Sequence, residues 1–238
     1  MSALGRTTLV TAGWYGKIAG LGDFASRRLD PAMTGRLDGW LQEAVAGSRR
    51  RSGAAWTEIY LTSPVWRFML YPGACGAGAW TGLLMPSVDK VGRYFPLVIA
   101  AGLPPRPLRT QSYAVLEDWL DRVEPVALAT LDTSAAVEAF DGALSAVPLE
   151  LPEEPPPLGG AARMLFGAGG DPEPAVHAMP GGASIASTFA RVAVELAGES
   201  MHGDSLWWAP TTHGEGLLAL RCPGLPGPDQ FDAMLRGS

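Results

Sequence analysis

Two groups of polar residues interrupt apolar, aromatic stretches of this chain, and they are the first places where chemistry is expected. The first group lies in the segment 16–24, with the sequence GKIAGLGDF, and the second lies in 86–97, with the sequence PSVDKVGRYFPL. Asp89 and Arg93 are spaced so that a turn would let the carboxylate and the guanidinium pair. The side chains of Ser87 and Asp89 can also bond backbone N–H groups of their own loop.

We interpret these groups as a rigid surface that recognises another protein, because arginine beside exposed aromatic rings is typical of protein-interface anchors. In this hypothesis Arg93 and Lys17 are displayed with flanking aromatic side chains. The alternative is that the polar residues only fold a hairpin connection, since bonds from side chains to nearby backbone commonly build loops. The residues predicted to bind a partner are Lys17, Asp23, Phe24, Ser87, Asp89, Arg93, Tyr94 and Phe95.

A serine hydrolase is the enzymatic alternative. The sequence GDSL at 203–206, with Ser205 as its serine, matches the nucleophile block of GDSL-type esterases. In those enzymes the block lies near the N-terminus and an Asp-x-x-His pair follows late in the chain. Here the block is itself late, and the residue three positions before His213 is not aspartate. We therefore interpret the match as chance and expect no catalytic residue, with a Ser87/Asp89 arrangement as the other form of this alternative.

The sequence does not indicate metal, nucleotide or nucleic-acid binding. No His or Cys stands at ligand-like spacing from any of the three histidines, His177, His202 and His213, and no GxxxxGK[ST] phosphate loop occurs. The one dense basic cluster, Arg49-Arg50-Arg51, belongs to a chain of net charge −6 and is expected at a helix end, where cations suit the helix dipole. We therefore expect no cofactor, no metal and no nucleic-acid partner.

The elements that position these residues follow from hydrophobic periodicity. Strands are expected at 9–18 (broken by glycine), 65–71, 79–85, 94–101, 205–210 and 217–221. Helices are expected from Asp30-Pro31 to about Gly47, around 113–123 and 137–147, over 185–197 and after Gly227. The pattern predicts one α+β domain over 1–238, an α/β sandwich with a mainly antiparallel central sheet flanked by helices.

Three connecting segments complete this prediction. Residues 19–29 are expected to be a loop, and the Pro- and Glu-rich stretch 148–160 is expected to be a stiff linker or surface loop. The residues expected to cap the helix at 137–147 are Asp132, Thr133 or Ser134.

Composition limits the class of protein. Hydrophobic residues make up 47% of the chain and charged residues 18%, which excludes a disordered chain. The longest nearly apolar run, 96–103, is far shorter than the roughly 18–20 residues that cross a bilayer. The N-terminus lacks the apolar core of a secretory signal. We therefore expect a cytoplasmic protein without membrane insertion, in which Cys75 and Cys222 are free, buried thiols.

Several blocks carry a family resemblance. The segment 13–24 (GWYGKIAGLGDF) is similar to the pattern Gly-aromatic-aromatic-Gly-Lys-Leu/Ile-Pro-x-x-Gly-Asp-Phe, with Ala19 in place of the proline. The segment 64–68 (PVWRF) looks like a second motif, and 80–97 matches W-x-G-x-L-x-P-S-x-D-x-V-G-R-x-F-P-L. In these motifs the chain resembles the TagF family of type VI secretion-associated proteins. The late sequence SLWW at 205–208 resembles the end of that family, which accounts for the GDSL letters without an esterase.

The resemblance implies a single α/β sandwich with a mainly antiparallel sheet. It also implies a non-enzymatic, cytoplasmic regulator that represses assembly of the type VI secretion system after translation. The implied partner is the forkhead-associated scaffold protein of that system, and some members are fused to, or work beside, a PP2C-type phosphatase. A structural accessory subunit of the secretion baseplate is a further alternative.

Overall fold

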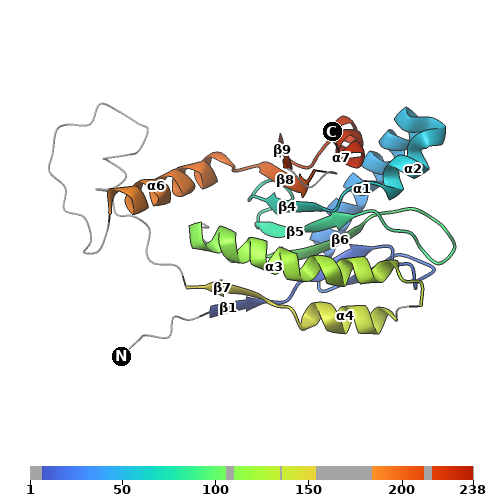
Figure 1. Cartoon of the computed structure of the whole chain (residues 1–238), viewed down its shortest axis with the longest axis horizontal. Helices are drawn as coiled ribbons and strands as arrows, with labels where there is room; N and C mark the ends of the chain where they lie inside the picture. Colours follow the sequence, from blue (N-terminus) through green and yellow to red (C-terminus); the bar gives the residue numbers. More distant parts are fainter. Residues whose placement is uncertain (1–6, 106–109, 135, 154–183, 212–215, 238) are drawn as a thin grey trace.

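Most of the expected strands assemble into one antiparallel sheet, as a computed structural model of the chain shows (Figure 1). The structure describes residues 7–105, 110–134, 136–153, 184–211 and 216–237. Within them, seven strands pair in the order β3-β2-β6-β5-β4-β8-β9. The strands of this sheet are β2 (Gly13–Gly16), β3 (Ala25–Arg27), β4 (Trp66–Leu70), β5 (Trp80–Met85), β6 (Leu97–Gly102), β8 (Asp204–Pro210) and β9 (Leu217–Pro223). A separate two-stranded ribbon joins β1 (Thr7–Val10) to β7 (Leu149–Pro152).

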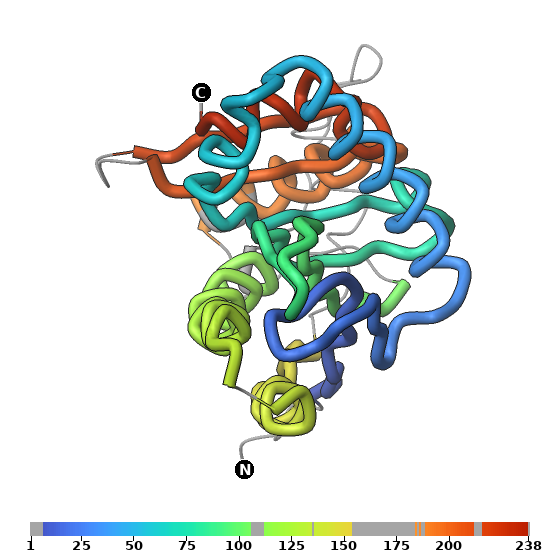
Figure 2. The backbone as a smooth tube through the Cα atoms, turned by 90° about the vertical axis from the view of Figure 1, so that its right-hand side faces the viewer, coloured from blue at the N-terminus to red at the C-terminus, as the bar shows by residue number. Residues whose placement is uncertain are grey.

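Helices cover both faces of the sheet (Figure 2). One face packs against α1 (Pro31–Ser52), α2 (Trp56–Leu61) and α7 (Pro228–Arg236), with a 3₁₀ turn at Gly53–Ala55 between the first two. The other face packs against α3 (Thr110–Leu128), α4 (Val137–Ser145) and the β1–β7 ribbon, and a 3₁₀ turn at Ala129–Leu131 follows α3. The helix α6 (Ile185–Ser200) contacts α3 and extends away from the sheet in Figure 1.

The alternation of side chains along each strand divides the core between these two layers. In β4, Phe68 packs towards α1 and α7, whereas Met69 packs towards α3. In β8, Trp207 is buried in the layer of Phe68, and the half-buried Trp208 packs against the opposite layer. The predicted class, an α+β sandwich with a mainly antiparallel central sheet flanked by helices, is confirmed.

The first helix confirms its predicted start and corrects its predicted end. Asp30 accepts a hydrogen bond from the backbone N–H of Met33 at 2.8 Å, as an N-cap does. The helix passes Gly47 and ends at Ser52, so its last turn carries the arginine triplet. A Cβ on Gly47 would lie 2.7 Å from the Cβ of Pro228, so this glycine permits close packing against α7 and does not end the helix.

Three local predictions were wrong. Residues 25–27 form β3 within the predicted loop 19–29, because they pair with β2. The stretch 148–160 begins with β7, in which Leu149 and Leu151 are buried while Glu150 is exposed; residues 154–160 lie outside the described residues. The helix α4 has Ala136 at its N-cap position with no side-chain bond. Asp132 instead accepts bonds from the N–H and hydroxyl of Ser134 and closes its own turn.

The strand expected at 94–101 starts later, at Leu97, because Pro96 stands just before it. Other predictions agree with the structure. Cys75 and Cys222 are free and buried. Among the described residues, no helix has the length and apolar character needed to cross a membrane.

Candidate functional site

The sheet brings the two polar groups to the same end of the molecule. Gly16, the last residue of β2, pairs with Leu97 of β6, and Leu97 also pairs with Met85, the last residue of β5. The connection 17–24 after β2 and the connection 86–96 between β5 and β6 therefore lie side by side, at the right-hand end of Figure 1. We call these two connections the paired loops.

A buried ion pair joins the paired loops. The ammonium of Lys17 lies 2.5 Å from Oδ2 of Asp89, and both side chains are almost completely buried. The same Oδ2 accepts a hydrogen bond from Nε of Arg93 at 2.7 Å. Oδ1 of Asp89 accepts the backbone N–H groups of Val91 and Arg93 at 3.1 and 2.8 Å. The predicted Asp89–Arg93 pair is therefore confirmed, and this carboxylate holds both loops in place.

The charge of Asp89 is fixed by these donors. Burial alone would raise the pKa of the carboxyl, because it disfavours the ionised form. Hydrogen bonds from Lys17 and from the backbone and side chain of Arg93 outweigh burial and hold the pKa of Asp89 well below its usual range. Asp89 is therefore ionised near neutral pH, and its four donors leave it unsuited to accept a proton from a substrate.

A second set of bonds ties the paired loops to α2. The hydroxyl of Ser87 donates to the backbone carbonyl of Lys17 at 2.7 Å. The hydroxyl of Tyr60 accepts the N–H of Ser87 at 2.9 Å and donates to its carbonyl at 3.0 Å. Burial is the main cause that raises the pKa of Tyr60, so it remains a neutral phenol. The Ser87 hydroxyl is thus used by the packing of its loop, because it donates to a backbone carbonyl and not to a general base.

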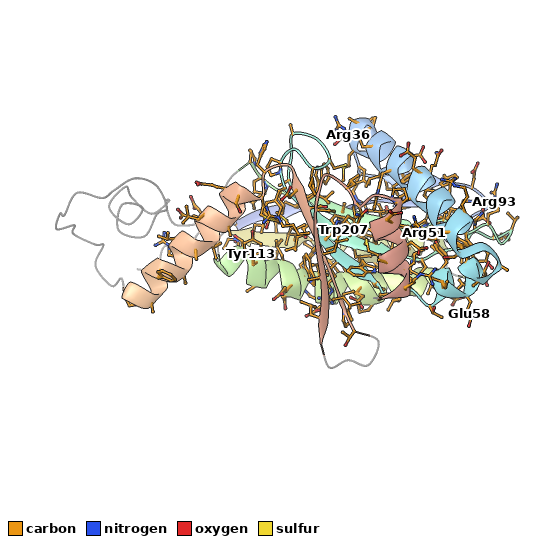
Figure 3. All side chains as sticks on the ribbon, turned by 90° about the horizontal axis from the view of Figure 1, so that it is seen from above. Arg36, Arg51, Glu58, Arg93, Tyr113 and Trp207 are labelled. Atoms are coloured by element: carbon orange, nitrogen blue, oxygen red, sulfur yellow. The ribbon has the colours of Figure 1, made fainter. Side chains whose placement is uncertain are left out.

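A set of exposed side chains lies above the buried Lys17–Asp89 pair, which we call the ionic base of the paired loops. Val91 is 68% exposed, Phe24 is 43% exposed, and the side chain of Arg93 is 56% exposed. Asp23 accepts the N–H of Phe24 at 2.8 Å, and the guanidinium of Arg93 donates to the carbonyl of Gly22 in the neighbouring loop. Figure 3 shows Arg93 projecting at the end of the molecule. We call Asp23, Phe24, Val91 and Arg93 the rim.

Aromatic rings link the rim to the interior. The Phe24 ring lies 4.7 Å from the ammonium of Lys17 and packs against the buried ring of Phe95 at 4.8 Å between centroids. The half-buried Tyr94 packs against Tyr60 and Trp56, at 5.8 and 6.0 Å between centroids. The rim therefore stands on a packed aromatic foundation.

The structure brings all the predicted partner-binding residues together but divides their roles. Lys17 is not displayed, contrary to our expectation, because its ammonium neutralises the buried Asp89. Ser87, Asp89 and Phe95 are buried as well, whereas Asp23, Phe24 and Arg93 are exposed. Whether any of them contacts a partner stays a prediction.

Trp56 and Tyr60 lie beneath the paired loops, and they were not predicted from the sequence. The segment around them gave no decisive pattern, but their separation of four residues places them on one face of a helix. The guanidinium of Arg49 lies 4.2 Å from the centre of the Trp56 ring. Arg49, the first residue of the triplet that was expected only to end a helix, therefore also covers this aromatic group.

The serine of the GDSL sequence is enclosed in the β8–β9 hairpin. Ser205 accepts Nε1–H of Trp207 at 2.9 Å, donates to the carbonyl of Gly224 at 2.6 Å and lies 3.3 Å from Sγ of Cys222. None of these groups is a general base, and Ser205 is completely buried. His177 and His213 lie outside the described residues. Within the part of the chain that is described, no three His, Cys, Asp or Glu side chains form a group that could hold a metal.

Comparisons with known proteins point to one family. Residues 13–147 match the family model described as the TagF N-terminal domain, type VI secretion system-associated. The chain is also similar to the crystal structure of PA0076 from Pseudomonas aeruginosa PAO1, with 35% sequence identity and a TM-score of 0.70. That alignment covers 95% of this chain and 94% of the other. No curated protein matches the chain.

Proposed function

Because this chain belongs to the TagF family of type VI secretion system-associated proteins, we propose that it is a cytoplasmic, non-enzymatic regulator that represses assembly of that secretion system. It acts by binding another protein. The partner implied by the family is the forkhead-associated scaffold protein, with a PP2C-type phosphatase in the same pathway. The observation that carries the proposal is an exposed rim held on a buried ionic base.

The ionic base orders the residues of the rim in the unbound protein. The Lys17–Asp89 pair fastens one loop to the other, and Arg93 is held at its Nε by Asp89 and at its terminal nitrogen by the Gly22 carbonyl. A side chain that is already ordered loses less conformational entropy on binding. Arginine and phenylalanine side by side also provide the charged and aromatic anchors that protein interfaces favour.

Binding is favoured over catalysis by the state of the two candidate serines. The hydroxyls of Ser87 and Ser205 are buried and donate to backbone carbonyls. An activated serine instead needs a base within hydrogen-bond reach and access for a substrate. Both serines are therefore structural in this proposal.

The test uses two exposed apolar residues as a matched pair. Val91→Glu changes a 68% exposed valine of the rim, and Leu131→Glu changes a 46% exposed leucine in the 3₁₀ turn after α3. The free energy of unfolding of both variants should lie within about 0.5 kcal/mol of the wild-type value, because neither position is buried. Val91→Glu should lose capture of the forkhead-associated scaffold and repression of secretion, while Leu131→Glu should keep both. A Val91→Glu variant that binds and represses like the wild type would remove the rim from the interface.

Two further measurements on the purified protein distinguish the proposed regulator from a serine hydrolase and from an accessory structural subunit. Labelling of Ser205 or Ser87 by a fluorophosphonate would support the hydrolase and contradict a regulator that acts only by binding. Stable co-assembly with baseplate or sheath proteins in place of the scaffold would support an accessory structural subunit. We expect neither result.

A further inference from the structure

The two edges of the sheet differ in length and chemistry. The edge strand β3 has three residues, ends in Arg27 and is followed by Arg28. The opposite edge strand, β9, has seven residues, LLALRCP, with one charge. That charge, Arg221, is paired within its own hairpin with Asp204 at 2.6 Å. Proteins usually protect a long edge with charges, bulges or a covering element, because unpaired backbone groups there attract other strands. β3 has such protection and β9 has little.

The hydrogen bonds that flank β9 show which of its backbone groups face outwards. The N–H of Thr211 donates to the carbonyl of Gly216 at 3.0 Å, and the N–H of Gly224 donates to the carbonyl of Gly203 at 2.7 Å. Antiparallel pairs alternate between bonded and non-bonded positions. Even-numbered residues of β9 therefore bond to β8, and odd-numbered residues direct N–H and C=O away from it. The odd-numbered residues with both groups are Leu217, Ala219 and Arg221.

This edge is open and partly apolar. Figure 3 looks down on β9, and no other described helix or strand crosses in front of it. Leu217 is 65% exposed. Ala219 is exposed and pairs with the half-buried Trp208 on β8, so an apolar strip reaches the edge from inside the sheet.

We propose that β9 pairs antiparallel with β9 of a second copy of this chain, about a twofold axis at Ala219, so that one sheet continues through both copies. In this register Ala219 faces Ala219 of the other copy, and Leu217 faces Arg221. Each facing pair exchanges two backbone hydrogen bonds. Pro223, which has no N–H to donate, lies outside the paired residues.

The sequence of β9 fits a second copy because the pairing is self-complementary. Arg221 never faces Arg221 in this register, so the single charge of the strand meets no like charge. The Asp204–Arg221 pair stays within each hairpin, so it does not need to break when the two strands meet. The twofold axis also places each outward N–H of β9 opposite an outward C=O of β9 in the other copy. This inference does not depend on the regulatory role or on the rim.

The first test compares two leucines of equal exposure. Leu217 and Leu9 are each 65% exposed, and Leu9 lies on β1, outside the main sheet. At tens of micromolar, sedimentation equilibrium of the full chain should give about twice the monomer mass of 25.0 kDa. Leu217→Lys places two like-charge contacts with Arg221 in the dimer and should weaken it by tenfold or more, whereas Leu9→Lys should not. A wild type that stays monomeric, or equal behaviour of the two variants, would overturn the proposal.

The second test fixes the register with a short cross-link between thiols. Facing residues of an antiparallel pair have Cβ atoms about 4.5–5.5 Å apart, which is within reach of a short bifunctional thiol reagent. Ala219→Cys should therefore give a covalent dimer with such a reagent, as seen on a denaturing gel. Leu217→Cys, which faces Arg221 of the other copy, should give much less. Because Cys75 and Cys222 are buried, they should contribute little background. No covalent dimer from Ala219→Cys, or equal linkage by both variants, would contradict the register.

Discussion

Asp89 and Ser205 are both buried polar groups, yet they have different surroundings and roles. Asp89 is charged, receives four donors and sits directly beneath an exposed rim. Ser205 is neutral, bonds Trp207 and Gly224, and is enclosed by its own hairpin. The sequence around each residue suggests a catalytic site when it is considered alone: a Ser87/Asp89 arrangement in one case and the GDSL block in the other. In our proposal the functional surface is the exposed rim above Asp89, and not the buried carboxylate itself.

The two groups also differ in what a substitution leaves behind. Removing one member of a buried ion pair strands an uncompensated charge, whereas removing a buried hydroxyl strands only neutral hydrogen-bonding groups. The comparison therefore predicts a graded series of effects.

The largest effect is expected from Asp89→Ala. This variant leaves the ammonium of Lys17 buried without its partner, so the free energy of unfolding should fall by about 3–5 kcal/mol. Urea titration followed by circular dichroism would measure it. Asp89→Asn keeps an acceptor for the N–H groups of Val91 and Arg93 and serves as the control for charge. A loss below about 1 kcal/mol in Asp89→Ala would show that the base of the paired loops is not held by this pair.

Acid should weaken the same pair. The pKa of Asp89 is lowered in the folded protein, so its contribution to stability is complete above the unfolded value of about 3.9 and is lost as pH falls below it. Unfolding free energies measured from pH 6 to pH 2 should fall more steeply for the wild type than for Asp89→Asn. Carboxylates such as Asp141 titrate in both proteins and cancel in the difference. Parallel curves would mean that the charge of Asp89 contributes nothing.

A smaller effect is expected from Ser205→Ala. The variant leaves the indole N–H of Trp207 and the carbonyl of Gly224 without this partner, which should lower stability by about 1–3 kcal/mol. Denaturation followed by tryptophan fluorescence would measure it. The exposed Ser200, changed to Ala, is the matched control and should stay within about 0.5 kcal/mol of the wild type. A change at Ser205 as small as the control would remove its structural role.

The smallest effect on stability, with a large effect on binding, is expected from Arg93→Ala. Its side chain is largely exposed, so its pair with Asp89 should contribute less than about 1 kcal/mol. Affinity for the scaffold, measured by calorimetry, should fall tenfold or more. Arg122 forms an exposed pair of the same spacing with Asp118, and Arg122→Ala should leave affinity unchanged. Unfolding of Arg93→Ala together with intact binding by its folded fraction would make Arg93 part of the base instead of the rim.

Local signals predicted most of the elements. Asp30 and Pro31 start α1 as expected. The Asp89–Arg93 pair was also predictable, because the two residues are only four positions apart. In each case the residues that decide the structure are neighbours in the sequence.

Features that depend on distant partners were not predictable in this way. The burial of Lys17 follows from Asp89, 72 residues away. Gly47 was expected to end a helix, but it lies inside α1 and permits the close approach of Pro228. The short strand β3 has no periodic pattern of its own and exists because β2 pairs with it. The division between base and rim has the same origin, since it depends on how two separate loops pack.

The β1–β7 ribbon has a consequence for biosynthesis. Val10 pairs with Leu149, so the ribbon encloses almost the same segment, 13–147, that the family model matches. Ribosomes add about 5–20 residues per second, so a nascent β1 waits on the order of ten seconds before its partner strand emerges. Until then Leu9 and its neighbours stay unpaired, in reach of chaperones and proteases. Pairing of β1 with β7 is thus a late step in maturation, after the segment between the two strands has been synthesised.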